Sequence, residues 1–246
     1  MTTNKSHFVF IRASLIAISM LFTSFSSMSS EKSVSENAQP KIIMDYAPVP
    51  FARLIGMADL IVVGDVETIE ESTFQFHVDE FLVNHHASRS LNVEKYIPPE
   101  FIAPRALTYA TGQRFILFLI KPDQNKTVQS WKILGIAGEG EMPIEDEYVY
   151  FNVYDLEGLE HTSHEVHGVT RNLQRYNLEI YKDAVKNYTT CFSWKLVKFI
   201  KNKKERSRWV PSKICPNESV LNYQAKSWVH EYLAQETMKR IPVAEE

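Results

Sequence analysis

The sequence predicts an α+β protein, in which a small antiparallel β-barrel or sandwich is followed by a C-terminal helical hairpin. Short apolar segments typical of strands follow one another between residues 60 and 150, and no helix-length crossover separates the early ones. From residue 177 the apolar residues recur with a period of about 3.6, which is typical of amphipathic helices. The 246 residues, 44% of them apolar, suffice for one core or for one core with an appendage.

The N-terminal segment has the layout of a secretory signal peptide. Lys5 and Arg12 precede an apolar run over 13–22, and a serine-rich stretch follows. The run covers about half of the roughly 20 residues that a transmembrane helix needs. We therefore expect a signal peptide over residues 1–29, a flexible linker over 30–48 and a secreted or periplasmic mature protein. An uncleaved membrane anchor is the alternative.

The first elements after the linker are predicted from apolar spacing. A short helix is expected over 49–58, and the β-branched run 60–66 is apolar at nearly every position, as in a strand buried on both faces. Residues 74–78 alternate apolar and polar side chains. The alternation then changes phase, which predicts a β-bulge near Asp79 or Glu80.

Further strand-like segments complete the predicted β-domain over residues 49–172. The proline-bearing segment 98–104 and the turn 111–114 interrupt them. The segments are 91–97, 115–120, 131–137, 142–144 and 148–150.

Two amphipathic helices are predicted to form the hairpin over residues 173–246. The first begins after Asn177, a preferred N-cap residue, and its apolar stripe continues to about residue 200. The second extends to about residue 240, and the segment 206–217 between them carries two prolines.

The two cysteines, Cys191 and Cys215, are expected to form a disulfide, because an exported protein meets an oxidising compartment. Closing a loop of this length stabilises a fold by roughly 3 kcal/mol on the chain-entropy model. Two free buried thiols are the alternative.

Three segments carry a resemblance to a known family: 58–66 (ADLIVVGDV), 76–83 (FHVDEFLV) and 111–119 (TGQRFILFL). They are similar to exported bacterial domains related to the netrin-like and tissue-inhibitor-of-metalloproteinases superfamily. The resemblance covers residues 49–150 and implies an OB-like five-stranded barrel with a non-enzymatic binding role. Those inhibitors chelate a protease zinc through an N-terminal cysteine, whereas this chain has no cysteine before Cys191. Protease inhibition by that mechanism is therefore not implied, and no functional residue is carried over.

The charge distribution points to a basic face on an acidic protein. The formal net charge is −3, which makes nucleic acid an unsuitable partner. On the predicted first helix and the loop after it, basic residues nevertheless gather, and such a face could meet anionic lipid headgroups, a polysaccharide or an acidic protein. The alternative is an ordinary solvated helix face. The predicted binding residues are Lys195, Lys198, Lys201, Lys203, Lys204, Arg206 and Arg208.

The densest group of potential metal ligands is formed by His161, His164 and His167. Steps of three residues spread the rings around a helix, and they place His164 on the opposite face of a strand, so a shared site requires an irregular loop. Two histidines of a zinc-protease helix are four residues apart, a spacing that this group lacks. A solvated loop is the alternative.

The sequence contains no recognisable dinucleotide, phosphate-loop or nucleophile-elbow motif, and so predicts no cofactor. It predicts an exported non-catalytic binding module that is not an enzyme, with an unknown protein or an anionic envelope component as partner. One alternative is a metal-dependent hydrolase that uses the histidine group. The other is a peripheral membrane-surface protein that binds through the basic helix.

Overall fold

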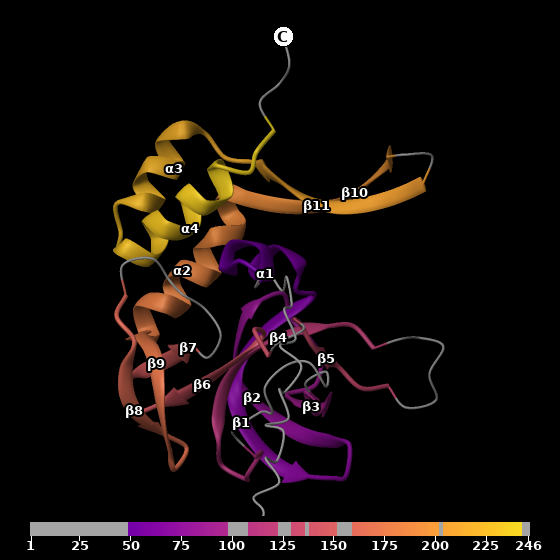
Figure 1. Cartoon of the computed structure of the whole chain (residues 1–246), viewed down its shortest axis with the longest axis vertical. Coiled ribbons are helices and arrows are strands. Elements are labelled where there is room, and N and C mark those ends of the chain that lie inside the picture. Colours follow the sequence, from indigo (N-terminus) through magenta and orange to yellow (C-terminus); the bar gives the residue numbers. More distant parts are fainter. Residues whose placement is uncertain are drawn as a thin grey trace, which may run out of the picture. The chain divides into compact units, whose positions relative to one another are not determined.

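A computed structural model describes residues 49–97, 108–122, 129–135, 138–151, 159–201 and 204–242, all within one compact unit over 42–246 (Figure 1). The predicted signal peptide and linker, 1–48, lie outside the described residues.

The described residues form four α-helices and eleven β-strands, which confirms the α+β class. The helices are α1 (Phe51–Met57), α2 (Leu178–Cys191), α3 (Asn217–Gln224) and α4 (Trp228–Met238). The strands are β1 (Leu60–Ile69), β2 (Thr73–Val83), β3 (Ser90–Glu94), β4 (Arg114–Ile120), β5 (Lys132–Ile133), β6 (Glu141–Glu145), β7 (Tyr148–Phe151), β8 (Thr162–Val166), β9 (Val169–Asn177), β10 (Phe192–Lys201) and β11 (Lys204–Lys213).

Nine strands form one sheet, in the order β3-β2-β1-β4-β6-β7-β9-β8, with β5 paired to β4. Every pair of named strands is antiparallel. The sheet is not closed, so the closed barrel stays a prediction. A single parallel bridge between Val93 and Trp131 brings the edge strand β3 beside the segment that leads into β5.

The β-bulge predicted from the change of phase is confirmed. In the pairing of β1 with β2, Val63 lies opposite Glu80 and Gly64 lies opposite Val78, so Asp79 has no direct partner. A bulge of this kind bends a strand and increases its twist.

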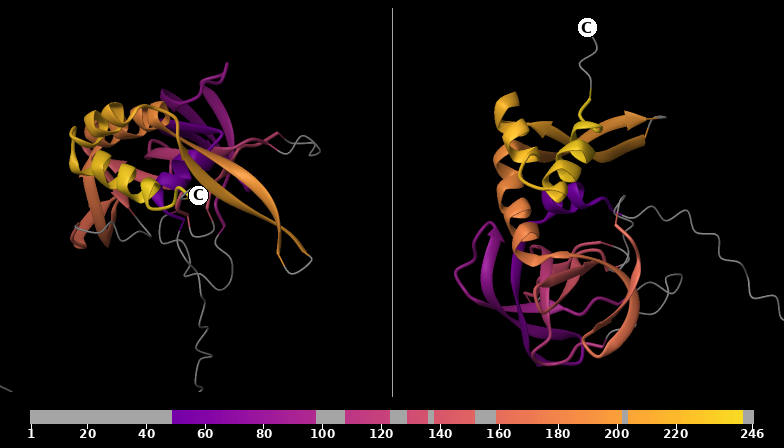
Figure 2. Two further views of the ribbon diagram at one scale, coloured as in Figure 1. Left: turned by 90° about the horizontal axis from the view of Figure 1, so that it is seen from above. Right: turned by 90° about the vertical axis from the view of Figure 1, so that its left-hand side faces the viewer.

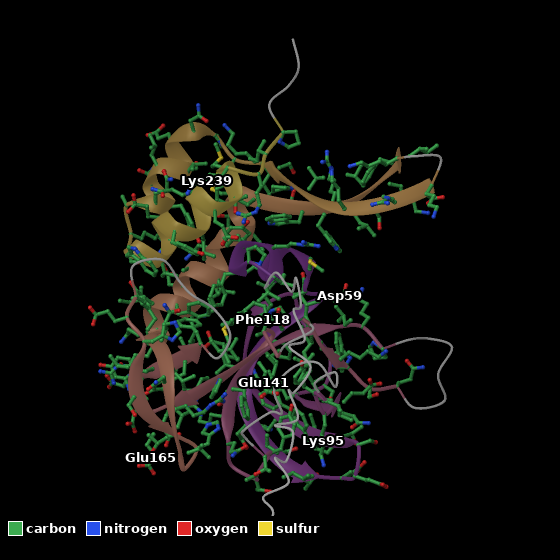
Figure 3. The ribbon with its side chains drawn as sticks, in the orientation of Figure 1. Asp59, Lys95, Phe118, Glu141, Glu165 and Lys239 are labelled. Atoms are coloured by element: carbon green, nitrogen blue, oxygen red, sulfur yellow. A yellow bond between two sulfur atoms is a disulfide. The ribbon has the colours of Figure 1, made fainter. Side chains whose placement is uncertain are left out.

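Strands β1 and β4 separate two apolar cores, which explains why residues 60–66 are apolar at nearly every position. Leu60, Val62 and Phe115 belong to an inner core enclosed by β1 to β5. Ile61 and Phe118 belong to an outer core, which also contains side chains of all four helices. Phe118 is labelled on β4 in Figure 3. Successive strand residues point to opposite faces, so one strand serves both cores.

The predicted helical hairpin is wrong in its first half. The helix begins as expected, since the Asn177 side chain accepts a hydrogen bond from the Ile180 N–H at 3.1 Å, but it ends at Cys191. Residues 192–201 form β10, which pairs with β11 along its whole length to make a two-stranded ribbon (Figure 2). Two helices follow, α3 and α4, where one was predicted, because the chain turns at 225–227.

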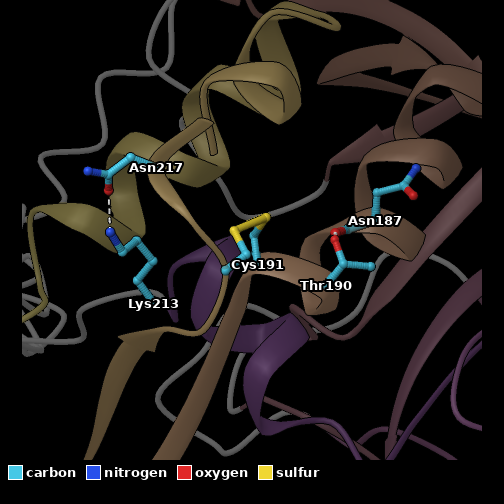
Figure 4. Close-up of a disulfide and its surroundings, with 6 residues drawn as sticks. Asn187, Thr190, Cys191, Lys213 and Asn217 are labelled. Carbon is cyan, nitrogen blue, oxygen red and sulfur yellow. Dashed lines mark hydrogen bonds between the residues drawn. A yellow bond between two sulfur atoms is a disulfide. The ribbon is translucent and has the colours of Figure 1, made fainter. Parts of the chain in front are cut away.

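The predicted disulfide between Cys191 and Cys215 is confirmed, and it closes the base of the ribbon (Figure 4). Cys191 is the last residue of α2 and Cys215 follows β11, with their Cα atoms 4.6 Å apart. The Ile214 N–H also donates to the Cys191 carbonyl at 2.9 Å. Lys213 donates from Nζ to Asn217 Oδ1 beside the same junction. The two ends of the ribbon are therefore held together covalently and by hydrogen bonds.

Candidate functional site

The ribbon is mounted rigidly at its base and extends beyond the helices, as Figure 1 shows. Trp194 of β10 is buried against α1, where a Cβ built on Gly56 would lie 1.9 Å from the Trp194 Cδ1 atom. Only glycine permits this approach. The Trp194 Nε1 also donates to the Tyr188 hydroxyl at 2.9 Å. The ribbon is thus anchored to both α1 and α2.

The pairing register places five cations on one face of the ribbon. Residues directly opposite each other on neighbouring strands share a face, and successive residues of one strand alternate. Val197 lies opposite Arg208, Phe199 lies opposite Arg206, and Lys201 lies opposite Lys204. We call the following set the cationic face, and each of its side chains is exposed: Lys195, Lys201, Lys204, Arg206 and Arg208.

The other face of the ribbon is largely apolar. Leu196 lies opposite Trp209, and Ile200 lies nearer the tip. Leu196 is 53% exposed and Ile200 is 80% exposed, although both are large hydrophobic side chains. The charges on this face are the ion pair of Lys198 Nζ with Glu205 Oε1 at 2.7 Å and Lys213 at the base. The single acidic side chain of β10 and β11 therefore lies away from the cationic face.

The basic residues predicted to bind do not lie on a helix, and the structure divides them between two faces. Lys198 is on the apolar face, whereas a helix would have grouped it with Lys195 and Lys201. Lys203 lies outside the described residues. The other predicted residues make up the cationic face.

The ribbon carries a charge opposite to that of the rest of the chain. Residues 192–213 contain eight of the 27 basic residues and one of the 30 acidic ones, which gives a formal charge of +7. The remaining 19 basic and 29 acidic residues give −10. The net charge of −3 therefore conceals a strong separation of charge.

The three histidines of the predicted metal group lie on or beside a strand that the sequence did not indicate, and each has different surroundings. His161 is exposed before β8, while the Nε2 atom of His164 lies 2.6 Å from the Thr162 hydroxyl. Burial, with a contribution from Arg175, lowers the pKa of His164. His167 lies at the turn after β8, with its ring against Phe115 and its Nε2 atom 3.1 Å from a backbone carbonyl. In the described part of the chain, no group of three or more His, Cys, Asp or Glu side chains could hold a metal ion.

A serine, a histidine and an aspartate form a hydrogen-bonded chain that the sequence analysis did not single out. His230 Nε2 lies 3.1 Å from Asp183 Oδ2, and Ser227 Oγ lies 2.7 Å from His230 Nδ1. Because a carboxylate only accepts, Nε2 carries the proton of the neutral ring and Nδ1 accepts from the serine. Ser227 is the N-cap residue of α4 and His230 lies in its first turn, while Asp183 belongs to α2. A serine three residues before a histidine at a helix start was the available sequence signal.

We interpret this chain as an anchor that fixes the start of α4 on α2. The His230 side chain is only 2% exposed and its ring packs against Tyr223 at 4.8 Å between centroids. Asp183 also accepts from Lys226 Nζ at 3.1 Å and from Asn187 Nδ2 at 2.6 Å. The contact of His230 with Asp183 therefore joins α4 to α2, and the other hydrogen bonds hold its two ends in place.

This anchor is expected to make stability depend on pH. Burial lowers the pKa of His230, and the nearby Lys226 lowers it further, while Asp183 opposes the change. The unfolded chain therefore binds a proton more readily, so the contribution of His230 is fully present above about pH 7 and is lost as the pH falls below about 6.5. Urea unfolding of the wild type and His230→Gln should show a larger wild-type advantage at about pH 7.5 than at about pH 5.5. Burial raises the pKa of Glu236, which acts in the opposite direction but equally in both proteins. A difference that stays constant across this range would contradict the expectation.

Comparison of the chain with protein-family models, with curated proteins and with solved structures found no match. Among the described residues, no helix is long and apolar enough to cross a membrane.

Proposed function

We propose that the chain is an exported, non-catalytic binding module whose ribbon binds the surface of an anionic lipid bilayer. The observation that carries the proposal is the cationic face, which has five exposed cations and no acid and also exposes Val197 opposite Arg208. Each well-placed cation contributes about 1 kcal/mol near an anionic membrane. Exposed apolar side chains next to cations are the composition of interfacial membrane contacts.

The charge separation favours one orientation at such a surface. An anionic bilayer attracts the ribbon and repels the rest of the chain, which carries a formal charge of −10. The module would therefore approach with the ribbon first.

Export and the OB-like barrel belong to the same proposal. The disulfide supports an oxidising compartment. The Trp131 N–H donates to the Asn92 carbonyl and the Glu94 N–H donates to the Trp131 carbonyl, both at 2.8 Å, which joins β3 to the segment before β5. Because β5 also pairs with β4 and strands β1 to β5 contribute to the inner core, these contacts support the proposal of an OB-like barrel. The metal-dependent hydrolase has less support, because the three histidines have separate surroundings.

Flotation of the chain without residues 1–29 with lipid vesicles tests this function. Vesicles containing phosphatidylglycerol should bind the protein, binding should fall as salt rises, and vesicles of pure phosphatidylcholine should bind weakly. The variant Lys195→Gln/Lys204→Gln removes two cations from the cationic face and should weaken binding by a factor of about 30. Val197→Ser, on the cationic face itself, should weaken binding without changing its salt dependence.

The matched control is Lys198→Gln/Lys213→Gln, which removes the same charge from the other face of the same ribbon. We expect it to change affinity by less than about threefold. Thermal unfolding checks that every variant folds. Equal effects of the two double variants, or equal binding to both kinds of vesicle, would contradict the proposal.

A further inference from the structure

A cleft with a volume of about 350 Å³ lies between β11 and the end of α4, apart from the exposed outer part of the ribbon. Its walls include Arg208, Trp209 and Pro211 from β11. Lys239 and Arg240, which follow α4, complete them. Figure 3 labels Lys239. A smaller neighbouring cavity of about 200 Å³ shares Lys239 and Arg240.

The cleft is lined by three cations and by no acidic side chain. Lys239 and Arg208 have no carboxylate partner in the described part of the chain. The Arg208 guanidinium instead lies 5.6 Å from the centre of the Phe199 ring. Lys239 and Arg208 are therefore the two cations of the cleft that are available to a ligand.

Arg240 is the member whose charge is compensated within the protein. Its Nη1 atom lies 3.1 Å from Glu236 Oε1 and donates to the Glu236 carbonyl at 2.6 Å. The same carboxylate accepts from the Ala52 N–H at 3.4 Å, so it also holds the first turn of α1. Glu236 is buried, and its carboxylate lies between Arg240 and the first turn of α1. Lys239 lies close enough to lower the pKa of Glu236, although burial dominates and raises it, but the two side chains form no ion pair.

A fourth cation, Arg53, lies near Arg240 but does not line the cleft. Burial lowers the pKa of Arg53 in α1, and repulsion from Arg240 lowers it further. Cations at the end of a helix are favoured by its dipole, which accounts for Lys239 and Arg240. The dipole of α4 does not account for Arg53 or Arg208, which come from other elements.

We infer that this cleft binds a phosphate group, with the guanidinium of Arg208 and the ammonium of Lys239 as its principal contacts. Arginine and lysine are the side chains that bind phosphate oxygens in proteins. Trp209 and Pro211 provide an apolar wall for the carbon atoms attached to the phosphate. The group could belong to a free phosphate ester or to a phospholipid headgroup. The inference does not rest on the binding of bilayers, because the cleft would bind the phosphate group of a free ester as well as that of a lipid headgroup.

Calorimetric titration of the chain without residues 1–29 with glycerol 3-phosphate tests the cleft, with glycerol as the uncharged comparison. We expect saturable binding of glycerol 3-phosphate alone and a rise in the melting temperature. Lys239→Gln and Arg208→Gln should each weaken it by about tenfold. Lys213→Gln, which removes a ribbon lysine outside the cleft, should leave it unchanged. Absence of saturable binding, or equal binding by wild type and Lys239→Gln, would overturn the inference.

Vesicles containing phosphatidylglycerol distinguish the two sources of phosphate. If Lys239→Gln weakens both vesicle binding and glycerol 3-phosphate binding, the ligand is a lipid headgroup. If it weakens only the latter, the ligand is a free phosphate ester, and the cleft is upheld in both cases. If the wild type binds glycerol 3-phosphate but not vesicles, the proposed binding of bilayers is contradicted and the inferred phosphate site is upheld.

Discussion

Replacing Tyr188 with alanine is expected to lower the free energy of unfolding by about 4 kcal/mol. This side chain is fully buried, and its ring stacks on Phe192 with 5.1 Å between centroids. Its hydroxyl accepts from Trp194 Nε1. Thr237 donates its own proton to the Leu233 carbonyl, so the Tyr188 hydroxyl donates to Thr237 Oγ1. One side chain therefore connects α2, the ribbon and α4.

The Tyr188→Phe variant separates the hydrogen bonds from the packing. It keeps the ring but leaves the Trp194 N–H without its acceptor, and we expect a loss of about 1–3 kcal/mol. Chemical denaturation of both variants measures the two changes. If Tyr188→Ala lowers the free energy of unfolding by less than about 1 kcal/mol, the ribbon is not held through this contact.

Replacing Cys191 and Cys215 together with alanine is expected to lower the free energy of unfolding by roughly 3 kcal/mol. The disulfide joins residues separated by 24 positions, and without it the unfolded chain gains conformational freedom. The loop that it closes is the ribbon, so the variant also tests whether ten antiparallel pairs suffice to hold that ribbon. Denaturant unfolding of the variant and of the reduced wild type should give similar losses. A variant as stable as the oxidised wild type would contradict this expectation.

Local sequence patterns predicted those elements in which the spacing of apolar and polar side chains reflects which faces of the element are buried. Residues 60–66 and 115–120 are apolar on both faces because two cores flank β1 and β4, and the sequence shows this directly. The bulge at Asp79 was predictable because a change of register must change the alternation of side chains. Asn177 was predictable as an N-cap because its side chain acts on the backbone three residues away.

The ribbon could not be predicted, because partners distant in the sequence determine it. Phe192, Leu196 and Phe199 have spacings that suit a helix equally well. The structure is decided by the pairing of β10 with β11 and by the burial of Trp194 on Gly56, neither of which the local pattern contains. A helix and a strand also place the same lysines on different faces. For this reason five of the seven predicted basic residues share one face of the ribbon, whereas the helix on which they were expected is wrong.

Strands β8 and β9 were missed for a related reason. Few of their residues are buried, and their mostly polar side chains gave no apolar alternation to detect. The chain of Ser227, His230 and Asp183 joins residues up to 47 positions apart, so its spacing alone carried little signal.

The length of the ribbon sets how its charges act at a distance. A strand of ten residues spans about 33 Å, whereas the Debye length at physiological ionic strength is about 8 Å. Ions in solution therefore screen the cations at the tip from the acidic remainder of the chain. The arm gives one small protein two electrostatic surfaces that operate independently, and a partner at the tip responds to the local positive field rather than to the net charge.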